Sequence, residues 1–267
     1  MPTASINQLR RLAGAARKQA IFTLGQVGLV HSSGRLTQDA SQYWNGDRND
    51  HWQNDSHWRS GSKFEDAEVW TAMGQEHLRL YQRLRRTASE PAPLKKIVDW
   101  GCGGGTNAVA FAPLAEELIL VDVNAASIGE CARQVTLASA TPFVKVLADI
   151  SHPEQAAQDI SRPCDLFLCF YVLELVPTQA YGLSVMRIAY DLLGQGGQAF
   201  VQIKYATSAW LTRPRRRSYS SDIAGTTYRI EDFWTAMAGI GFRPEAVVLV
   251  PENDFDERYA YFLLSKP

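Results

Sequence analysis

The chain has 267 residues, of which 46% are hydrophobic and 21% are charged. That length allows either one large domain with an elaboration or two small domains, and in both cases a sizeable buried core. The 27 basic residues nearly balance the 28 acidic ones, so no overall field attracts nucleic acid, and such a substrate would need a local basic patch.

The first thirty residues carry basic side chains ahead of a short apolar run, Ile21–Leu24. Gly25 and Gln26 interrupt that run and no small-residue cleavage site follows, so we expect neither a signal peptide nor a membrane span. Apolar residues recur three and four positions apart, which is typical of one helix face: Ile6, Leu9, Ala13, Ala16, Ala20, Leu24 and Val27. We expect this helix to pack on its own domain; a homodimer contact and a peripheral membrane contact are the other interpretations.

Residues 32–62 are rich in Gly, Ser, Asn, Asp, His and Trp without a sustained period, which predicts loops. Titratable and aromatic side chains concentrate at Asp47–Trp58. Two interpretations stay open: Trp52 and Trp58 close the edge of the core, or the segment folds over a ligand and supplies substrate contacts. The spacing of its acids and histidines matches no standard zinc pattern, so no metal ligand is predicted.

Beyond this segment the pattern is regular. A helix over Phe64–Thr87 is indicated by apolar residues on one face, and Pro91 and Pro93 end it. Five apolar strands then alternate with helices, and a glycine-rich turn at Gly194–Gly197 precedes the fifth strand. The expected strands are Lys96–Trp100, Leu118–Val123, Phe143–Leu147, Asp165–Phe170 and Ala199–Lys204, and the expected helices begin near Asn107 and cover Ala125–Ala138, Pro153–Ile160 and Thr178–Leu193.

A helix at Ile230–Ala238 follows, and a short acidic loop joins two further strands at Ala246–Val250 and Tyr259–Leu264, which predicts a hairpin. Alternating strands and helices form right-handed crossovers and a mostly parallel sheet. We therefore expect an α/β fold: a doubly wound, seven-stranded, mostly parallel sheet with an antiparallel C-terminal strand. Residues 1–90 would form a helical and loop cap region, and residues 91–267 a single ligand-binding domain.

The junction after the first strand is a glycine loop with the pattern D-x-G-x-G, formed by Asp99, Gly101 and Gly103. Glycine permits a tight strand-to-helix turn and a close approach of the backbone to a ligand, so we predict a nucleotide-like ligand. The dinucleotide pattern G-x-G-x-x-G would need glycine or alanine at position 106, which is Thr106.

Acidic side chains follow the next strands at the edge where ligands bind in doubly wound sheets. Asp122 ends the second strand, close to the ~20-residue offset at which a carboxylate receives ribose hydroxyls. Asp149 follows the third strand, where it could accept from an exocyclic amine while Ile150 packs on the ring. The fourth strand leads into an aromatic cluster with Glu174. Together these strand ends predict a ligand that contains adenosine.

Over roughly residues 95–265 this order of motifs resembles the class I S-adenosylmethionine-dependent methyltransferases of the small-molecule type, with a Rossmann-like fold. The resemblance implies S-adenosylmethionine as cofactor, with the glycines near its methionine part, Asp122 on the ribose, Asp149 and Ile150 on the adenine, and Phe170 at the floor of the transfer site. The cofactor-binding set it implies is Asp99, Gly101, Cys102, Gly103, Asp122, Val123, Asp149, Ile150 and Phe170.

The acceptor is less well marked. Many small-molecule members of this family have Leu-Glu-His where this chain has Leu173-Glu174-Leu175. The sequence contains no Asn-Pro-Pro-Tyr, which makes DNA adenine methylation a weaker hypothesis. A hydroxyl acceptor benefits from a nearby base, and the candidates are His57, His51 and Glu174, of which His57 ranks first because Trp52 and Trp58 could seat an acceptor beside it. Trp58 and Tyr171 are the predicted acceptor contacts beside it.

Residues 205–228 form a long connection that contains Arg213–Arg217. Guanidinium groups suit phosphate or carboxylate, so Arg215, Arg216 and Tyr219 are predicted to contact an anionic acceptor; a solvated basic loop is the other interpretation. An RNA acceptor could use the same cluster, but the near-neutral net charge disfavours it.

The four cysteines, Cys102, Cys131, Cys164 and Cys169, form no C-x-x-C pair and are typical of reduced residues in a cytoplasmic protein. The sequence thus predicts a cytoplasmic enzyme that methylates a hydroxyl of a small molecule, sugar-derived or a secondary metabolite. An N-methyltransferase, an RNA methyltransferase and a non-catalytic S-adenosylmethionine-binding protein are the alternatives.

Overall fold

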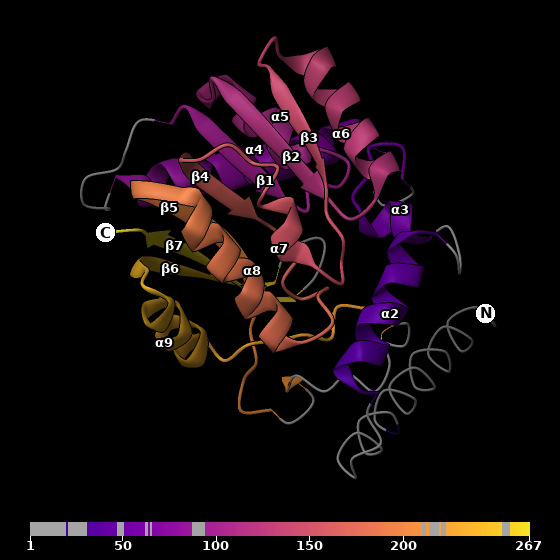
Figure 1. The fold of residues 1–267 in the computed structure, drawn as a ribbon, viewed down its shortest axis with the longest axis vertical. Coiled ribbons are helices and arrows are strands. Elements are labelled where there is room, and N and C mark those ends of the chain that lie inside the picture. The colour runs from indigo at the N-terminus through magenta and orange to yellow at the C-terminus, as the bar shows by residue number, and fades with distance from the viewer. Residues whose placement is uncertain are drawn as a thin grey trace, which may run out of the picture.

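The computed structural model is a layered α/β molecule with one central sheet (Figure 1). It describes residues 20, 31–46, 51–61, 64, 66–86, 94–209, 212–213, 219, 223–252 and 257–267. The helix expected over residues 6–27 lies outside these ranges apart from residue 20, and so does any homodimer contact made by it.

The sheet has seven strands in the order β3-β2-β1-β4-β5-β7-β6. The strands are β1 (Lys96–Trp100), β2 (Glu117–Asp122), β3 (Phe143–Leu147), β4 (Cys164–Cys169), β5 (Leu193–Lys204), β6 (Arg243–Glu252) and β7 (Glu257–Ser265). Strands β1 to β5 are parallel to one another, and β7 runs antiparallel between β5 and β6. This arrangement confirms the predicted doubly wound sheet and its antiparallel C-terminal strand.

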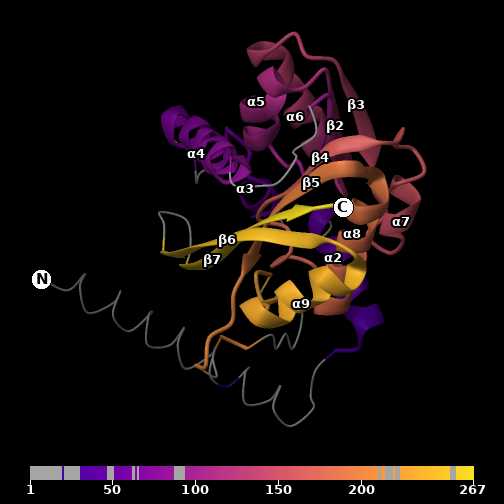
Figure 2. The same ribbon diagram turned by 90° about the vertical axis from the view of Figure 1, so that its left-hand side faces the viewer.

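Helices cover both faces of the sheet. They are α2 (Ser33–Trp44), α3 (His51–Asp55), α4 (Ala67–Arg85), α5 (Thr106–Phe111), α6 (Ala125–Ala138), α7 (Pro153–Ala156), α8 (Gln179–Leu192) and α9 (Ile230–Ile240). In Figure 2, α4, α5 and α6 lie on one side of the sheet, and α7, α8 and α9 on the other. Strand β1 serves both cores because its side chains alternate: Ile97 packs with the α4 side, and Val98 and Trp100 pack with the α8 side.

The prediction of a loop-rich segment over residues 32–62 is wrong for two stretches, which form α2 and α3. Ser32 caps α2 by accepting a hydrogen bond from the backbone N–H of Arg35. Leu36, Ala40 and Tyr43 are spaced as on one helix face, and all three are buried. The many small and polar residues in the segment had obscured this period.

The turn expected at Gly194–Gly197 lies inside β5, which begins at Leu193. The pairing of β5 with β4 is irregular here, since the register shifts between Cys164 and Leu166. Gly196 has a φ of 73°, which glycine adopts at little cost. The glycines therefore form a bulge within the strand rather than a turn before it.

The segment from α2 to residue 61 packs against the carboxyl ends of the strands, next to α8 in Figure 1. The division into a cap of residues 1–90 and a domain of residues 91–267 stays a prediction. No helix in the described ranges combines the length and hydropathy needed to cross a membrane.

Candidate active site

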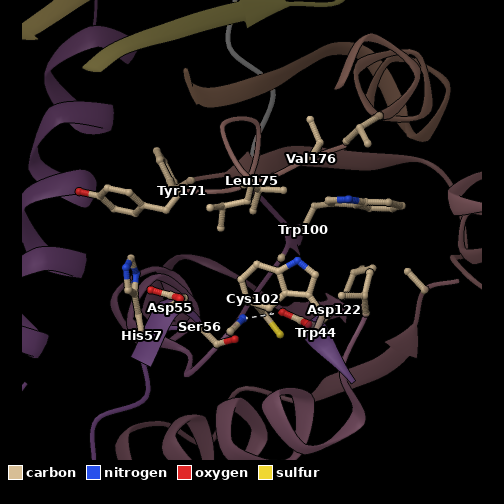
Figure 3. Close-up of a pocket in the computed structure, with 18 of the residues that line it drawn as sticks. Trp44, Asp55, Ser56, His57, Trp100, Cys102, Asp122, Tyr171, Leu175 and Val176 are labelled. Atoms are coloured by element: carbon tan, nitrogen blue, oxygen red, sulfur yellow. Dashed lines mark hydrogen bonds between the residues drawn. The ribbon is translucent and has the colours of Figure 1, made fainter. Parts of the chain in front are cut away.

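A pocket of about 840 Å³, counted out to its mouth, opens at the carboxyl ends of β1, β2 and β4. This is the edge at which doubly wound sheets bind ligands. The walls come from the glycine loop, from the strand ends and from the N-terminal segment: Trp44, Asp55, Ser56, His57, Trp100, Gly101, Cys102, Gly103, Thr106, Asn107, Val121, Asp122, Val123, Ala148, Ile150, Phe170, Tyr171, Val172, Leu175, Val176, Pro177, Tyr181 and Val185. Figure 3 shows the labelled members of this set around the cavity.

The glycine loop needs its glycines for steric reasons. Gly101 and Gly103 have φ values of 77° and 50°, in the left-handed region. A Cβ on Gly101 would lie 2.2 Å from Cγ2 of Val172, and one on Gly103 would lie 2.4 Å from the carbonyl oxygen of Ser56. The loop is therefore closely packed on both sides, and its backbone forms part of the pocket wall.

The N-terminal segment is bonded directly to this loop. The backbone N–H of Gly104 donates to the carbonyl oxygen of Ser56 at 2.7 Å. A Cβ on Gly104 would lie 2.3 Å from the carbonyl oxygen of His57. Of the two interpretations of residues 47–58, this geometry agrees with a segment that folds over the ligand site.

Asp122 lies at the end of β2 with both carboxylate oxygens turned to the backbone. Oδ2 accepts from the N–H of Gly103 at 2.9 Å (Figure 3), and Oδ1 accepts from that of Asn124 at 3.0 Å. Burial raises the pKa of this carboxyl, and these backbone hydrogen bonds oppose the shift. A carboxylate has about four lone-pair sites, so Asp122 keeps acceptor capacity for ribose hydroxyls.

Asp99 lies beneath the loop and does not line the pocket. It is 1% exposed, and its Oδ2 has no hydrogen-bond partner among the described residues. Burial, followed by repulsion from Asp122, raises the pKa of Asp99 to about 7. Cys102 lines the pocket, and burial raises the pKa of its thiol well above the usual value, so it is a neutral wall residue.

The apolar part of the wall contains Val123, Ile150 and Phe170 as predicted from the strand ends. Asp149 does not line the pocket: its side chain is 52% exposed, with Oδ1 on the N–H of Ser151 at 2.7 Å. Its predicted contact with the adenine amine stays a prediction.

The other end of the pocket is aromatic. The His57 and Tyr171 rings meet edge to face with centroids 4.9 Å apart. The carbonyl oxygen of His57 accepts from Nε1 of Trp70 at 2.8 Å, and its ring contacts Phe64. In Figure 3 this pair lies on the opposite side of the cavity from Asp122.

Three other predicted residues lie away from the pocket lining. Glu174 is 2% exposed, with its Oε1 3.5 Å from Nε2 of Gln202. Trp58 donates to the hydroxyl of Ser127 at 3.2 Å, and Tyr219 is fully buried. Arg215 and Arg216 lie outside the described residues. The predicted roles of all five residues stay predictions.

Tyr219 instead links two residues of the pocket wall, Trp44 and Leu175. We call these three residues the roof of the pocket. The indole N–H of Trp44 donates to the Tyr219 hydroxyl at 2.6 Å, and that hydroxyl donates to the carbonyl oxygen of Leu175 at 2.5 Å. A second tie runs from the side-chain amide of Asn124 to the carbonyl oxygen of Trp44 at 2.6 Å. These contacts join Trp44 and Leu175, which both line the pocket, to each other and to Asn124.

A buried polar network supports the pocket wall from behind. His77 on α4 is 4% exposed and stacks flat on Phe170, with centroids 4.5 Å apart and planes 8° apart. Its Nδ1 is 2.7 Å from Oδ1 of Asn107 and its Nε2 is 3.2 Å from the Tyr261 hydroxyl. Burial lowers the pKa of His77 to about 4, so the ring is neutral at physiological pH.

The sequence did not single out several wall residues, including Trp44, Asn107 and Tyr181. Asn107 follows the glycine loop directly, and this position could have identified it. Trp44 and Tyr181 come from helices distant in the sequence and have no local signal. Within the described ranges, no group of three or more His, Cys, Asp or Glu side chains is placed to hold a metal ion.

The groups that line the pocket suit an adenosine cofactor with an amino-acid end. Val123 and Ile150 are apolar, Asp122 offers a carboxylate, and Gly101 and Gly103 expose backbone without a side chain. The pocket lining continues from there to the aromatic pair, His57 and Tyr171.

A curated relative and two solved structures are similar to this chain. The ubiquinone biosynthesis O-methyltransferase of Pseudomonas aeruginosa is 31% identical over 108 residues, which cover 40% of this chain and 43% of that protein. The chain thus matches less than half of the length of this relative. Magnesium protoporphyrin IX methyltransferase from Synechocystis has a TM-score of 0.59 at 14% identity, covering 85% of this chain and 97% of that one. The N-methyltransferase NodS from Bradyrhizobium japonicum has a TM-score of 0.52 at 17% identity, covering 71% and 87%.

These two structures share the fold of this chain. A family model described as a methyltransferase domain matches residues 70–247, more than half of the chain. This match confirms the predicted family and, through it, S-adenosylmethionine as the cofactor. The chain therefore belongs to the methyltransferase-domain family.

Proposed function

We propose that this protein transfers a methyl group to a hydroxyl of a small molecule, sugar-derived or a secondary metabolite. The observation that carries the proposal is the position of His57, whose imidazole lines the pocket beside Tyr171. A neutral amine can attack unaided, whereas a hydroxyl must lose its proton during attack and benefits from a base. An imidazole at the acceptor end therefore favours oxygen as the target atom. The partial relative from Pseudomonas aeruginosa, an O-methyltransferase by name, supports the same choice.

The cofactor supplies, when bound, a methyl group on a positively charged sulfur that is open to in-line displacement. The task of the chain is to align the two reactants and exclude water. The glycine loop and Asp122 hold one end of the site, and Phe170 and Tyr171 seat the acceptor at the other. His57 accepts the hydroxyl proton while the new oxygen–carbon bond forms. We assign this step to His57 rather than Glu174, because Glu174 does not line the pocket.

Arg215 and Arg216 would recognise an anionic group on the acceptor. The described neighbour Arg213 is exposed, which suits such a contact. We place the reaction in the cytoplasm because all four cysteines are buried and unpaired.

The test is methyl incorporation from radiolabelled S-adenosylmethionine into a panel of hydroxyl and amine compounds and a metabolite extract. We expect His57→Ala to lower turnover on the hydroxyl acceptor by roughly 10²–10⁴-fold, while the calorimetric affinity for S-adenosylhomocysteine stays within about twofold. His51→Ala is the matched control, since His51 is on the same segment and does not line the pocket. Unchanged turnover in His57→Ala would remove His57 from the mechanism, and incorporation into amines alone would show that nitrogen is the target.

A further inference from the structure

We infer that the methyl acceptor is a polyol with hydroxyls on neighbouring carbons, and that Asp55 binds the hydroxyl next to the one that is methylated. The inference rests on the proposed function, because it takes oxygen as the target atom and His57 as the base. It adds a binding residue that the sequence did not single out and narrows the acceptor to one chemical class.

Asp55 is the last residue of α3, and a tight turn follows it. The N–H of Ser56 donates to the carbonyl oxygen of Trp52 at 2.8 Å, and the N–H of His57 donates to that of Asn54 at 3.2 Å. His57 then has a φ of 54°, in the left-handed region. Side chains two positions apart on a helix do not face each other. Because the chain leaves the helix here, Asp55 and His57 both line the pocket.

A hydrogen bond from α2 holds the Asp55 side chain. The Tyr43 hydroxyl donates to Oδ2 of Asp55. Burial, followed by this hydrogen bond, raises the pKa of Tyr43, so the phenol keeps its proton and remains a donor. The backbone next to Asp55 is also fixed, since the carbonyl oxygen of Ser56 accepts from the N–H of Gly104 at 2.7 Å. Tyr43 does not line the pocket, so it is a positioning residue for Asp55.

The charges of the lining indicate what kind of group Asp55 binds. The described lining residues include two carboxylates, Asp55 and Asp122, and neither lysine nor arginine. In Figure 3, Asp55 is on the same side of the cavity as His57 and Tyr171, away from Asp122. A carboxylate has about four lone-pair sites, so Asp55 can accept from Tyr43 and from a ligand together. The group bound there is therefore a hydrogen-bond donor, and an anionic part of the acceptor would lie beyond this lining.

Among hydrogen-bond donors, a hydroxyl suits this position better than an ammonium group. The cofactor brings a positively charged sulfur into the same cavity, and that charge repels a cationic acceptor. A hydroxyl is uncharged and forms a strong, charge-assisted hydrogen bond to a carboxylate, as ribose hydroxyls do. Two residues of chain span at most about 7 Å, so the hydroxyls that meet Asp55 and His57 are close together on the acceptor. Hydroxyls on adjacent carbons satisfy both residues.

The first experiment removes neighbouring hydroxyls from a metabolite extract before methylation. Periodate cleaves the bond between carbons that carry neighbouring hydroxyls, and borohydride reduces the aldehydes that form. The products keep hydroxyls, but these are no longer adjacent. We expect methyl incorporation from radiolabelled S-adenosylmethionine to fall roughly tenfold or more in the treated extract. An extract that receives the same reagents after they have been quenched is the control.

A cation exchanger distinguishes a hydroxyl from an ammonium group at Asp55. At neutral pH the exchanger retains ammonium compounds, whereas polyols pass through it. We expect the methyl-accepting activity of the extract in the flow-through. The active fraction then serves as the acceptor for the variants below.

Asp55→Asn keeps an oxygen for the Tyr43 hydroxyl but removes the negative charge and one acceptor oxygen. We expect the concentration of the active fraction that gives half the maximal rate to rise roughly ten- to hundredfold. The affinity for S-adenosylhomocysteine, measured by calorimetry, should stay within about twofold. Asp159→Asn is the matched control, because Asp159 is exposed and does not line the pocket.

Tyr43→Phe tests the positioning of Asp55. The variant keeps the ring packed against Trp44 and Tyr219, with centroids 5.1 Å and 5.9 Å away, and loses the hydrogen bond to Asp55. We expect a smaller rise, roughly three- to tenfold, in the same half-saturating concentration, and no change in the affinity for S-adenosylhomocysteine. Tyr81→Phe is the control, because it removes a buried hydrogen bond away from the pocket, from the Tyr81 hydroxyl to Gln198 at 2.8 Å. It should lower the melting temperature and leave the half-saturating concentration unchanged.

Acceptor activity that survives periodate, or that binds to the cation exchanger, would overturn the inference. A parent-like half-saturating concentration in Asp55→Asn would also overturn it, and so would an equal loss of affinity for S-adenosylhomocysteine, because that loss would show a structural role. If the untreated extract accepted no methyl group, the proposed function itself would fail, and that outcome is distinct from the others.

Discussion

The rings of His57 and Tyr171 meet edge to face, and both residues have a φ of 54°. Left-handed backbone is unusual for such side chains and persists only where the surroundings enforce it. Here the enforcing contacts are known: Trp70 donates to the His57 carbonyl oxygen at 2.8 Å, and the Tyr171 N–H donates to Oε1 of Gln202 at 2.5 Å. Two strained residues in contact at one end of the pocket agree with the preorganised acceptor site that we propose there.

Removing the Tyr171 ring should damage acceptor binding more than cofactor binding. We expect Tyr171→Ala to raise the KM for the acceptor roughly tenfold or more, because the lost wall is worth about 1.5–3 kcal/mol of apolar contact. The affinity for S-adenosylhomocysteine, measured by calorimetry, should change little. Tyr190→Ala is the matched control, since Tyr190 packs edge to face on Phe242 at 5.1 Å outside the pocket. If the two variants changed the KM equally, Tyr171 would not be part of the acceptor site.

The contact between the N-terminal segment and the glycine loop should be sensitive to a single methyl group. Gly103→Ala would place a Cβ 2.4 Å from the Ser56 carbonyl oxygen and Gly104→Ala one 2.3 Å from that of His57. We expect each to destabilise the fold by about 1–3 kcal/mol in chemical unfolding and to abolish tight cofactor binding. Gly129→Ala on α6, with nothing within 4 Å, should be neutral or slightly stabilising. Wild-type affinity in both loop variants would show that the segment moves aside freely.

The free energy of unfolding should depend on pH through two buried groups, Asp99 and His77, whose contributions change in opposite directions. Asp99 has a pKa raised to about 7, so its stabilising contribution is complete below about pH 4 and is lost as the pH rises through 7. His77 has a pKa lowered to about 4, so its contribution is complete above about pH 6.5 and is lost as the pH falls through 4. In the parent, the two trends oppose each other between pH 4 and pH 6.5.

The variants should separate these trends in urea unfolding measured from pH 4 to pH 8. Asp99→Asn removes the falling trend of Asp99, so between pH 4 and pH 6.5 the free energy of unfolding should rise with pH relative to that of the parent. His77→Asn removes the rising trend of His77, so over the same range it should fall with pH relative to that of the parent. Identical pH profiles for the two variants would contradict the assignment.

Product release should depend on the roof. Tyr219→Phe removes both the hydrogen bond from Trp44 at 2.6 Å and the one to Leu175 at 2.5 Å. We expect S-adenosylhomocysteine to dissociate roughly five- to fiftyfold faster in stopped-flow fluorescence. An unchanged dissociation rate would mean that the ligand leaves by another route; Tyr81→Phe again serves as the control.

The sequence predicted the mostly parallel sheet, the hairpin of its last two strands and several pocket residues at the strand ends, because these features depend on local period and spacing. Gly101, Gly103 and Asp122 follow from a pattern that spans about 20 residues. The roof could not be predicted in this way, since Trp44 and Tyr219 are 175 positions apart. Similarly, His77 was recognisable as a residue on a buried helix face, but its partner Tyr261 is 184 positions away.

The loop prediction for residues 32–62 failed for a different reason. The small and polar composition of this segment masks its period, although Leu36, Ala40 and Tyr43 have a helical spacing. The outcome shows that small polar residues do not exclude a helix when one face can be buried.

Strand β7 comes after every other described strand in the chain, yet it lies inside the sheet between β5 and β6. During synthesis, β6 therefore has no place in the sheet until Glu257–Ser265 has left the ribosome. Tyr261 belongs to this strand and completes the hydrogen bonds of His77 behind the pocket. Assembly of the pocket wall near Phe170 and His77 is thus delayed until translation has passed β7, and a nascent chain that stops before it lacks both the strand that joins β5 to β6 and the hydrogen bond between Tyr261 and His77.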